Sequence, residues 1–298
     1  MRIIKGDFIL EDGKAIYIPD GKTIYNGWGE IGSTHLIDEE MKELPVQLLI
    51  SWLSLTENKF YAGNFKLPYE HILKLFRTGF TDPKTGEKTT YSRIIAGVAP
   101  DGVVSVWIAG QGIVTEVAFF KAEPTKIDWA QVTDDTQRTR KEFIHDRLEE
   151  VLTAGDMEFL ASHKPPKGLW ESYRTLYEWA PFIVGRARPS GIWIRSFNGE
   201  NQYADLTQIK VIKSGKRPVP KRAEFFWLSA DAKKYSAVIH FNEEEILKAY
   251  AKLAGGNSGT HLKLQVEISD IDQSVKIYLS NDKYILELKA CIKNVYSN

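Results

Sequence analysis

Residues 52–63 read WLSLTENKFYAG, and residues 227–238 read WLSADAKKYSAV. The two stretches lie 175 positions apart, and both begin with Trp-Leu-Ser and continue through a polar turn into a second β-rich run. Similarity at a fixed spacing is the signature of an internal repeat, and a missed repeat misassigns the whole fold. The matching residues are Trp52, Leu53, Ser54, Lys59, Phe60 and Ala62 against Trp227, Leu228, Ser229, Lys234, Tyr235 and Ala237.

Two further blocks match in the same order along the chain. Glu70, Ile72, Leu73, Lys74 and Phe76 correspond to Glu244, Ile246, Leu247, Lys248 and Tyr250, with helical spacing in both copies. Val104, Val106, Trp107, Ile108 and Glu116 correspond to Val275, Ile277, Tyr278, Leu279 and Glu287. Small changes of offset fit loops of different length, which surface connections tolerate. The three blocks predict a duplicated unit.

Each copy is predicted to contain a β-hairpin, one helix and three more strands. In the first copy the hairpin covers residues 46–55 and 59–67, the helix covers 68–78, and strands cover 91–99, 103–109 and 113–121. Pro68 suits a first helical turn, and Gly79 suits a helix end. In the second copy the hairpin covers 222–230 and 233–241, a helix capped by Asn242 runs to about residue 253, and strands cover 261–268, 274–280 and 284–290.

The segment between the copies has a different pattern. Residues 134–154 show helical charge pairing that ends near Gly155, residues 164–168 read KPPKG, and residues 170–179 are predicted to form a short aromatic helix. We therefore expect an α+β fold with two tandem related lobes, each a mainly antiparallel sheet with one helix, joined by a helical connector. The predicted boundaries are 1–125 for the first lobe, 126–181 for the connector and 182–298 for the second lobe.

Composition limits the class of protein. The 298 residues include 39 basic and 39 acidic side chains and 43% hydrophobic residues, which argues against a basic nucleic-acid binder and against a disordered chain. The lone Cys291 cannot form an internal disulfide, which favours a reducing compartment. The first residues lack the pattern of a signal peptide, and no apolar run is long enough for a bilayer. We expect a cytoplasmic globular protein with no direct nucleic-acid contact and no membrane span.

Motifs that carry chemistry are weak in this sequence. Residues 27–32 read GWGEIG and match G-x-G-x-x-G, but no βαβ unit surrounds them, so a glycine-rich loop around Trp28 is expected. Glu142 and His145 have a spacing used in di-iron bundles, yet a second pair is missing and a charge-paired helix is the better interpretation. Cys291 fits a small buried residue, and no G-x-S-x-G elbow occurs. We predict no catalytic residue, no metal ligand and no cofactor. Trp52, Trp107, Trp193 and Trp227 fall in strand-like runs and are expected in the core.

Five stretches of the chain carry a family resemblance: LPVQLLISWLSLTENKFYAGNFKLPYEHILKLF at residues 44–76, IIAGVAPDGVVSVWIAG at 94–110, EVAFFKA at 116–122, WESYRTLYEW at 170–179 and SFNGE at 196–200. They resemble a bacterial family of uncharacterised proteins, often lipoproteins, encoded beside type VI secretion toxins. It implies an immunity protein that occludes the active site of a cognate toxin. This sequence departs from the family pattern in lacking a signal peptide and a lipid-accepting Cys, which favours a toxin that acts in the cytosol, such as a nuclease.

The net charge of zero hides two unequal halves. Residues 1–150 carry 18 basic and 23 acidic side chains, and residues 151–298 carry 21 and 16. Nuclease clefts are basic because they bind phosphates, so the acidic group Asp38, Glu39, Glu40 and Glu43 is the predicted contact with the toxin. Two other classes stay open: a small-molecule or glycan-acting enzyme with a cleft between the lobes, and a scaffold subunit of the secretion machinery or envelope. The sequence leaves the oligomeric state undetermined.

Overall fold

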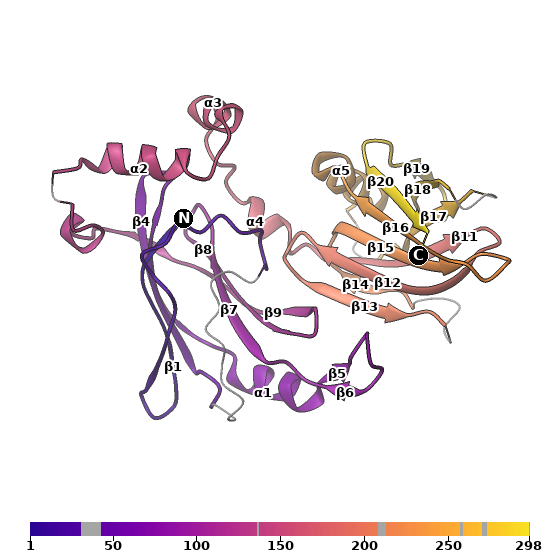
Figure 1. Ribbon diagram of the computed structural model, residues 1–298, viewed down its shortest axis with the longest axis horizontal. Helices are drawn as coiled ribbons and strands as arrows, with labels where there is room; N and C mark the ends of the chain where they lie inside the picture. Colours follow the sequence, from indigo (N-terminus) through magenta and orange to yellow (C-terminus); the bar gives the residue numbers. More distant parts are fainter. Residues whose placement is uncertain (31–42, 136, 208–212, 257–258, 270–272, 298) are drawn as a thin grey trace. The chain divides into compact units, whose positions relative to one another are not determined.

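The computed structural model describes residues 1–298 apart from 31–42, 136, 208–212, 257–258, 270–272 and 298 (Figure 1). The fold is built mainly of antiparallel sheets with a few helices, which confirms the expected α+β class. Two compact units can be separated. The first comprises Met1–Phe80, Lys88–Gly110 and Val114–Trp170, and the second comprises Thr81–Glu87, Gln111–Ile113 and Glu171–Asn298.

The first unit contains a five-stranded antiparallel sheet. Its strands are β1 (Arg2–Ile9), β2 (Ala15–Tyr17), β3 (Gln47–Ser54), β4 (Lys59–Lys66) and β10 (Glu123–Thr125). They lie in the order β10-β4-β3-β1-β2. Because successive side chains of a strand point to opposite faces, Leu48, Ile50 and Trp52 share one face, and all three are buried. The hairpin predicted at the first repeat block is therefore present as β3 and β4.

A second layer of the first unit follows the hairpin. It contains α1 (Tyr69–Thr78), the short strands β5 (Phe80–Thr81) and β6 (Lys88–Thr89), and then β7 (Arg93–Val98), β8 (Val103–Gly110) and β9 (Ile113–Lys121). The last three pair in the order β9-β8-β7. Every residue of β8 is buried, as its nearly continuous apolar sequence VVSVWIAG suggests. Strand β7 ends the sheet and is half-buried along its whole length.

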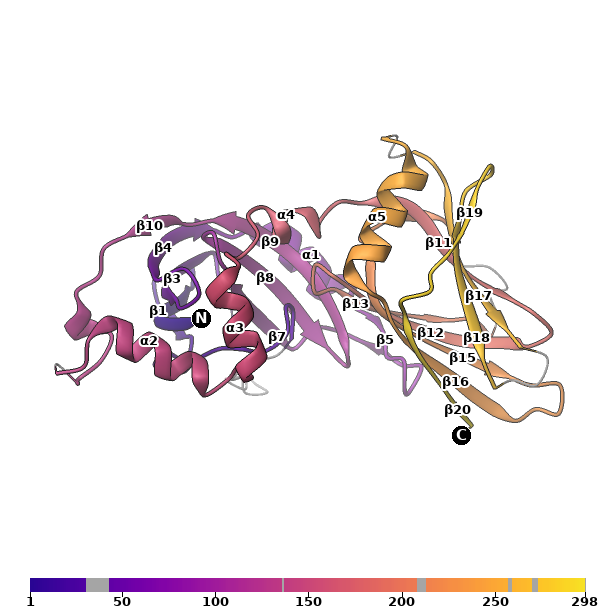
Figure 2. The same ribbon diagram turned by 90° about the horizontal axis from the view of Figure 1, so that it is seen from above.

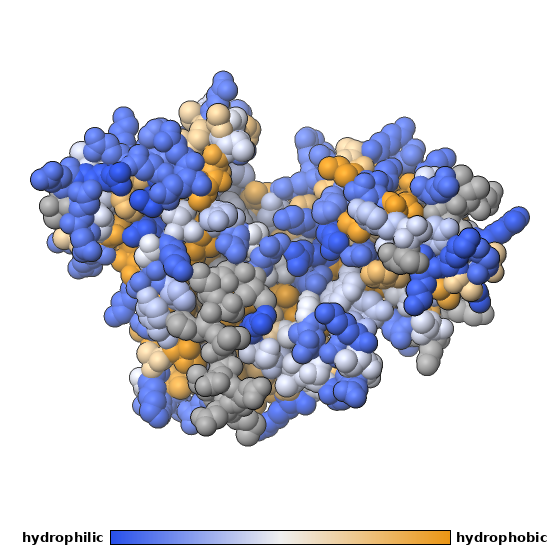
Figure 3. Space-filling view, viewed as in Figure 1, coloured by the Kyte–Doolittle hydropathy of each residue, from blue (hydrophilic) through white to orange (hydrophobic). Residues whose placement is uncertain are grey.

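Helices α2 (Arg140–Glu149) and α3 (Ala154–Ser162) follow the 3-10 turn η1 (Trp129–Gln131). Phe143 and Ile144 of α2 pack on Leu53 and Phe60 of the β3–β4 hairpin, and α2 lies beside that end of the sheet in Figures 1 and 2. The surface over α2 is hydrophilic (Figure 3). Leu53 and Phe60 therefore form a small core of their own on the face of the sheet opposite Trp52.

Two predictions for this region are wrong. Gly155 does not end a helix, because Thr153 forms a capping box with Asp156 and starts α3 around it. The expected helix over residues 170–179 is limited to α4 (Leu169–Ser172), and Tyr177 already begins strand β11. In β11 the side chains of Trp179 and Pro181 are buried and their neighbours are less buried, which is the alternation of a strand. The spacing of the aromatic residues in the sequence did not show this alternation.

The second unit contains the five-stranded sheet β14-β11-β17-β18-β19, the run of paired strands β20-β16-β15-β12-β13, and α5 (Glu243–Ala254), which contacts β17 and β18 (Figure 2). Asn242 caps α5 through its side chain, as predicted, and Gly255 ends the helix with a φ of 58°. The strands are β11 (Tyr177–Val184), β12 (Arg188–Ser196), β13 (Asn201–Asp205), β14 (Gly215–Arg217), β15 (Pro220–Leu228), β16 (Lys234–His240), β17 (Leu262–Ile268), β18 (Val275–Ser280), β19 (Ile285–Glu287) and β20 (Ile292–Ser297).

One sheet of each unit has the same topology. The corresponding strands lie next to one another in the same spatial order, which is β10-β4-β3-β1-β2 in the first unit and β20-β16-β15-β12-β13 in the second. Trp52 is paired with Ile3 on the neighbouring strand, and Trp227 is paired with Pro189. In both cases the strand register shifts directly after the residue that pairs with the tryptophan. This shared topology agrees with the repeat in the sequence, while descent by duplication stays a prediction.

The pairing corrects one detail of the repeat alignment. Trp52 lies opposite Tyr61, with ring centroids 5.3 Å apart and nearly parallel planes, and Trp227 lies opposite Tyr235 with a centroid distance of 5.8 Å. Tyr61, not Phe60, is therefore the counterpart of Tyr235. The slip arises because eight residues lie between Trp52 and Tyr61 but only seven lie between Trp227 and Tyr235, so the second hairpin has a turn one residue shorter.

The remaining expectations about buried residues are mostly met. Trp52, Trp107 and Trp227 are fully or almost fully buried, and Cys291 is buried, but Trp193 is only half-buried. None of the described helices is both long and apolar enough to cross a bilayer.

Phe143 gives a test of how α2 is held on the sheet. Its ring is 3% exposed and meets the Trp129 ring edge-on at 5.2 Å, with the guanidinium of Arg2 5.1 Å from its centroid. We expect Phe143→Ala to lower the free energy of unfolding by about 3–5 kcal/mol, because it leaves a cavity. Phe159→Ala in α3 is the matched control, since Phe159 is 59% exposed and its loss should change stability by less than about 0.5 kcal/mol. Urea titration followed by tryptophan fluorescence measures both, and equal losses would contradict this packing.

Candidate binding site

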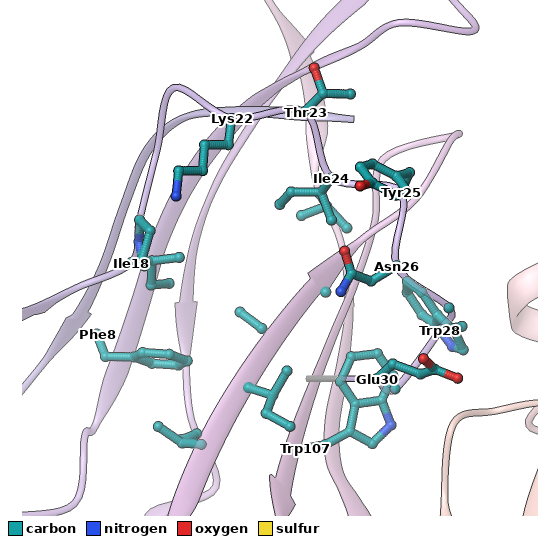
Figure 4. Close-up of a pocket in the computed structure, with 18 of the residues that line it drawn as sticks. Phe8, Ile18, Lys22, Thr23, Ile24, Tyr25, Asn26, Trp28, Glu30 and Trp107 are labelled. Carbon is teal, nitrogen blue, oxygen red and sulfur yellow. The ribbon is translucent and has the colours of Figure 1, made fainter. Parts of the chain in front are cut away.

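A pocket of about 430 Å³ lies within the first unit, between the β1–β2 hairpin and the edge strand β7. Its walls are mostly aliphatic and aromatic. Figure 4 shows Phe8 and Ile18 on one side and Trp28, Glu30 and Trp107 on the other. The third wall is the segment of residues 22–30, which crosses from the hairpin toward β7.

Backbone hydrogen bonds hold the segment after β2 against β1. The Ile18 amide donates to the Gly6 carbonyl at 2.9 Å, and the Gly21 amide donates to the Ile3 carbonyl at 3.1 Å. The Ile24 amide donates to the Met1 carbonyl at 2.7 Å, and the Met1 amino group donates back to the Ile24 carbonyl at 3.0 Å. The first strand of the chain therefore positions this wall of the pocket.

A tight turn places Trp28 at the end of the wall. The Glu30 amide donates to the Gly27 carbonyl at 2.9 Å, and Gly29 adopts a φ of 74°, a conformation that favours glycine. Trp28 then meets the ring of Trp107 edge-on at 4.9 Å. Gly97 of β7 makes room for this pair, because a Cβ there would lie 2.6 Å from Cζ3 of Trp107.

The wall carries polar atoms without partners. The indole nitrogen of Trp28 and the hydroxyl of Thr23 are buried and have no hydrogen-bond partner in the described part of the chain. A buried polar group without a partner costs about 1–3 kcal/mol. Lys22, Tyr25 and Glu30 are exposed at the rim, and Tyr25 is 71% exposed. An apolar interior with a mixed polar rim is suited to binding an apolar group and to fixing its orientation.

Most of the predicted contact residues are not among the residues that the structure describes. Asp38, Glu39 and Glu40 lie outside the described residues, and Glu43 is an exposed residue just before β3, close enough to influence Lys14 electrostatically. Glu43 does not line the pocket. The acidic contact surface therefore stays a prediction.

The weak motifs have structural roles. Glu142 completes the capping box of α2 with Thr139, and this bonding holds the pKa of Glu142 below its usual value. His145 lies 3.2 Å from the carboxylate of Glu149 on the same exposed helix. The described residues contain no cluster that could hold a metal ion. Residues 27–30 form the turn described above, so the expected glycine-rich loop around Trp28 is present.

Sequence reasoning did not identify residues 22–30 as the wall of a pocket. A signal existed, since Tyr25 and Trp28 are large aromatic residues in a stretch rich in Gly and Asn with no strand or helix pattern. Aromatic residues in such a segment have no regular element in which to be buried. They are therefore candidates for binding as well as for packing.

The first half of the chain identifies its family. Residues 1–155 match the family described as "Protein of unknown function (DUF2931)", and this match covers more than half of the chain. The protein therefore belongs to the DUF2931 family. No curated protein matches the chain. No solved structure matches it either.

Gly97 tests the architecture of the pocket. In Gly97→Ala the new methyl group collides with Trp107, so we expect a loss of about 1–3 kcal/mol in unfolding free energy and a change in the near-ultraviolet circular dichroism of the Trp28–Trp107 pair. Gly155→Ala is the control, because its Cβ meets only Thr153 Oγ1 at 3.9 Å and alanine favours helix. Unchanged stability and an unchanged tryptophan spectrum in Gly97→Ala would refute the described contact.

Proposed function

We propose that this protein is a binding protein whose partner is another protein. The observation that carries the proposal is the pocket of the first unit with its rim of exposed Tyr25, Lys22 and Glu30 around a partly buried Trp28. Tyrosine and tryptophan are enriched among the residues that contribute most to binding at protein interfaces. A partner side chain inserted there would gain apolar burial, and the rim charges would select its orientation.

The partner that we propose is a cognate toxin of a type VI secretion system. On this proposal the protein is an immunity protein that acts in the cytoplasm and neutralises the toxin, such as a nuclease, by occluding its active site. The support is the resemblance of residues 44–76 and 94–110 to proteins encoded beside such toxins. Part of that resemblance, residues 94–98, forms β7 and lines the pocket.

Charge supports an additional contact. The acidic excess of residues 1–150 fits a partner with a basic cleft, and Glu43 is exposed to solvent. Exposed charges at the rim of an interface act mainly on the association rate, and salt weakens their effect. Asp38, Glu39, Glu40 and Glu43 are thus proposed to accelerate capture, while the pocket determines how long the complex lasts.

A second candidate is a protein that binds or converts a small molecule or glycan in the pocket. Its volume of about 430 Å³ lies within the range of small-ligand sites, which is roughly 300–1,000 Å³. A ligand of this class should bind the isolated protein and raise its unfolding temperature. A protein partner of the proposed kind should raise that temperature without any small molecule.

Co-expression with the toxin gene encoded next to this protein's gene tests the main proposal. We expect growth to be rescued and a complex to survive size-exclusion chromatography. Failure of both results would contradict the immunity function. Alanine replacement of Asp38, Glu39, Glu40 and Glu43 together should slow association about tenfold at low salt with little effect on dissociation. An unchanged association rate would remove only the acidic contact.

Tyr25 tests the role of the pocket rim. We expect Tyr25→Ala to weaken toxin binding by about tenfold or more, mostly through faster dissociation, because it removes an exposed aromatic anchor. The matched control is Tyr284→Ala in the second unit, since Tyr284 is 66% exposed and Tyr25 is 71% exposed. Surface plasmon resonance measures both rates, and equal effects of the two substitutions would argue against the pocket as the contact.

A further inference from the structure

Among the described strands, β7 is the last of its sheet, so one row of its backbone groups has no strand partner there. The Ala99 amide donates to the Val103 carbonyl at 2.9 Å, and pairing along β7 and β8 continues in register to Arg93 and Ala109. In an antiparallel ladder the residues that bond to the neighbour alternate with residues that point away. The amides and carbonyls of Ile94, Ala96 and Val98 therefore point away from β8. No described strand pairs with these three residues on that side of β7.

The corresponding strand of the second unit has a partner on this side. Ile95 lies opposite Trp107, and Gln265 lies opposite Tyr278, the counterpart of Trp107 in the repeat. Strand β17 is thus the counterpart of β7. Its outer edge pairs in parallel with β11, from Trp179 beside Leu262 to Val184 beside Glu267.

Alternate residues of β11 complete the core of the second unit. Trp179 is fully buried, its indole nitrogen donates to the carbonyls of Arg217 and Pro218 at 3.3 and 3.2 Å, and its ring meets the Tyr250 ring at 5.8 Å. Pro181 is also buried, whereas Phe182, the next residue along the strand, is 39% exposed. The side chains on one face of β11 are therefore sufficient to complete the core of the second unit.

The first unit has the pocket on the edge where the second unit has β11. Ile94, Ala96 and Val98, the residues with outward backbone groups, all line it, as do Phe8 and Ile18 on the side of the hairpin. In Figure 4 this space is bordered by β7 and by the segment that carries Asn26 and Trp28. Backbone groups for a ladder and an apolar space for side chains thus lie side by side.

We propose that β7 accepts an extended peptide segment of a partner protein as a parallel strand, with apolar side chains at alternate positions entering the pocket. Strand addition of this kind obtains affinity from main-chain hydrogen bonds and specificity from side-chain pockets. This inference rests on the proposed function only for the identity of the partner. On that proposal, the peptide segment is an exposed strand of the toxin. Its geometry comes from the comparison of β7 with β17.

The chain itself supplies the probe. Residues 177–187, YEWAPFIVGRA, comprise β11 and the three residues that lead into β12. Strand β12 corresponds to β1, and Arg188 pairs with Leu228 as Arg2 pairs with Leu53. Placing these eleven residues directly before Arg2 therefore reproduces the connectivity of the second unit in the first. A tethered segment binds at a high effective concentration, so even a weak acceptor should be occupied.

We expect hydrogen exchange at the amides of Ile94, Ala96 and Val98 to slow at least tenfold in the extended chain, with no change in its oligomeric state. The matched control is the same extension in an Ala96→Pro chain, because that substitution removes an outward N–H and leaves the β7–β8 bonds in place. A second control carries Trp→Asp and Ile→Asp at the positions copied from Trp179 and Ile183. Both controls should lose the protection.

Unchanged exchange in the extended chain, or protection that persists in the Ala96→Pro control, overturns the proposal. A labelled synthetic peptide of residues 177–187, added to the unmodified chain, checks the result without a tether: saturable binding that Ala96→Pro abolishes supports the acceptor edge. These measurements use no toxin, so they stand apart from the co-expression test. Growth rescue by the extended chain, whose edge is occupied, would overturn β7 as the docking edge for the toxin and leave the proposed function intact.

Discussion

The stacked pair of tryptophan and tyrosine at the turn end of each hairpin is the interaction on which both units depend. Trp52 packs on Tyr61 and Trp227 packs on Tyr235, and each tryptophan is almost completely buried. An aromatic pair directly across an antiparallel ladder fixes register as well as adding contact, because a slip of one residue would turn every side chain to the opposite face. The strands next to these hairpins, β1 and β12, each have a shift of register directly after the residue that pairs with the tryptophan.

The two units use this common sheet differently. In the second unit, β11 completes the interior with Trp179 and Pro181 and leaves no outward backbone row on β17. In the first unit, Trp28 enters from an irregular segment and takes up part of the space through its edge contact with Trp107. No described strand pairs with the outward backbone groups of Ile94, Ala96 and Val98, and the pocket lies beside them. A single missing strand thus explains both the pocket and the open edge.

The sequence predicted the parts of the fold that carry strong local signals. The hairpins, α1 and α5 follow from turn residues, caps and apolar spacing, and the repeat shows that the two hairpins belong to equivalent sheets. Strand β1, with its sequence RIIKGDFI, was not identified because charged residues interrupt its alternation, and β2 was not identified because it is only three residues long. Residues 177–179 were assigned to a helix because aromatic spacing at three to six residues is ambiguous between periods. The pocket could not be predicted, since it arises from residues 8–30 and 94–107 that only the tertiary fold brings together.

An exposed strand edge is a liability that proteins usually block with charges, proline or a covering element. The sequence RIIAGV of β7 has none of these at its three outward-facing positions, and its single charge, Arg93, lies at the end of the strand. The matching edge of the second unit shows that this fold can cover such a strand with one segment of the same chain. An apolar edge beside a pocket that no described strand covers is difficult to explain by stability alone, since covering it would add both hydrogen bonds and apolar burial. Use of the edge by a partner is the simplest reason for keeping it open.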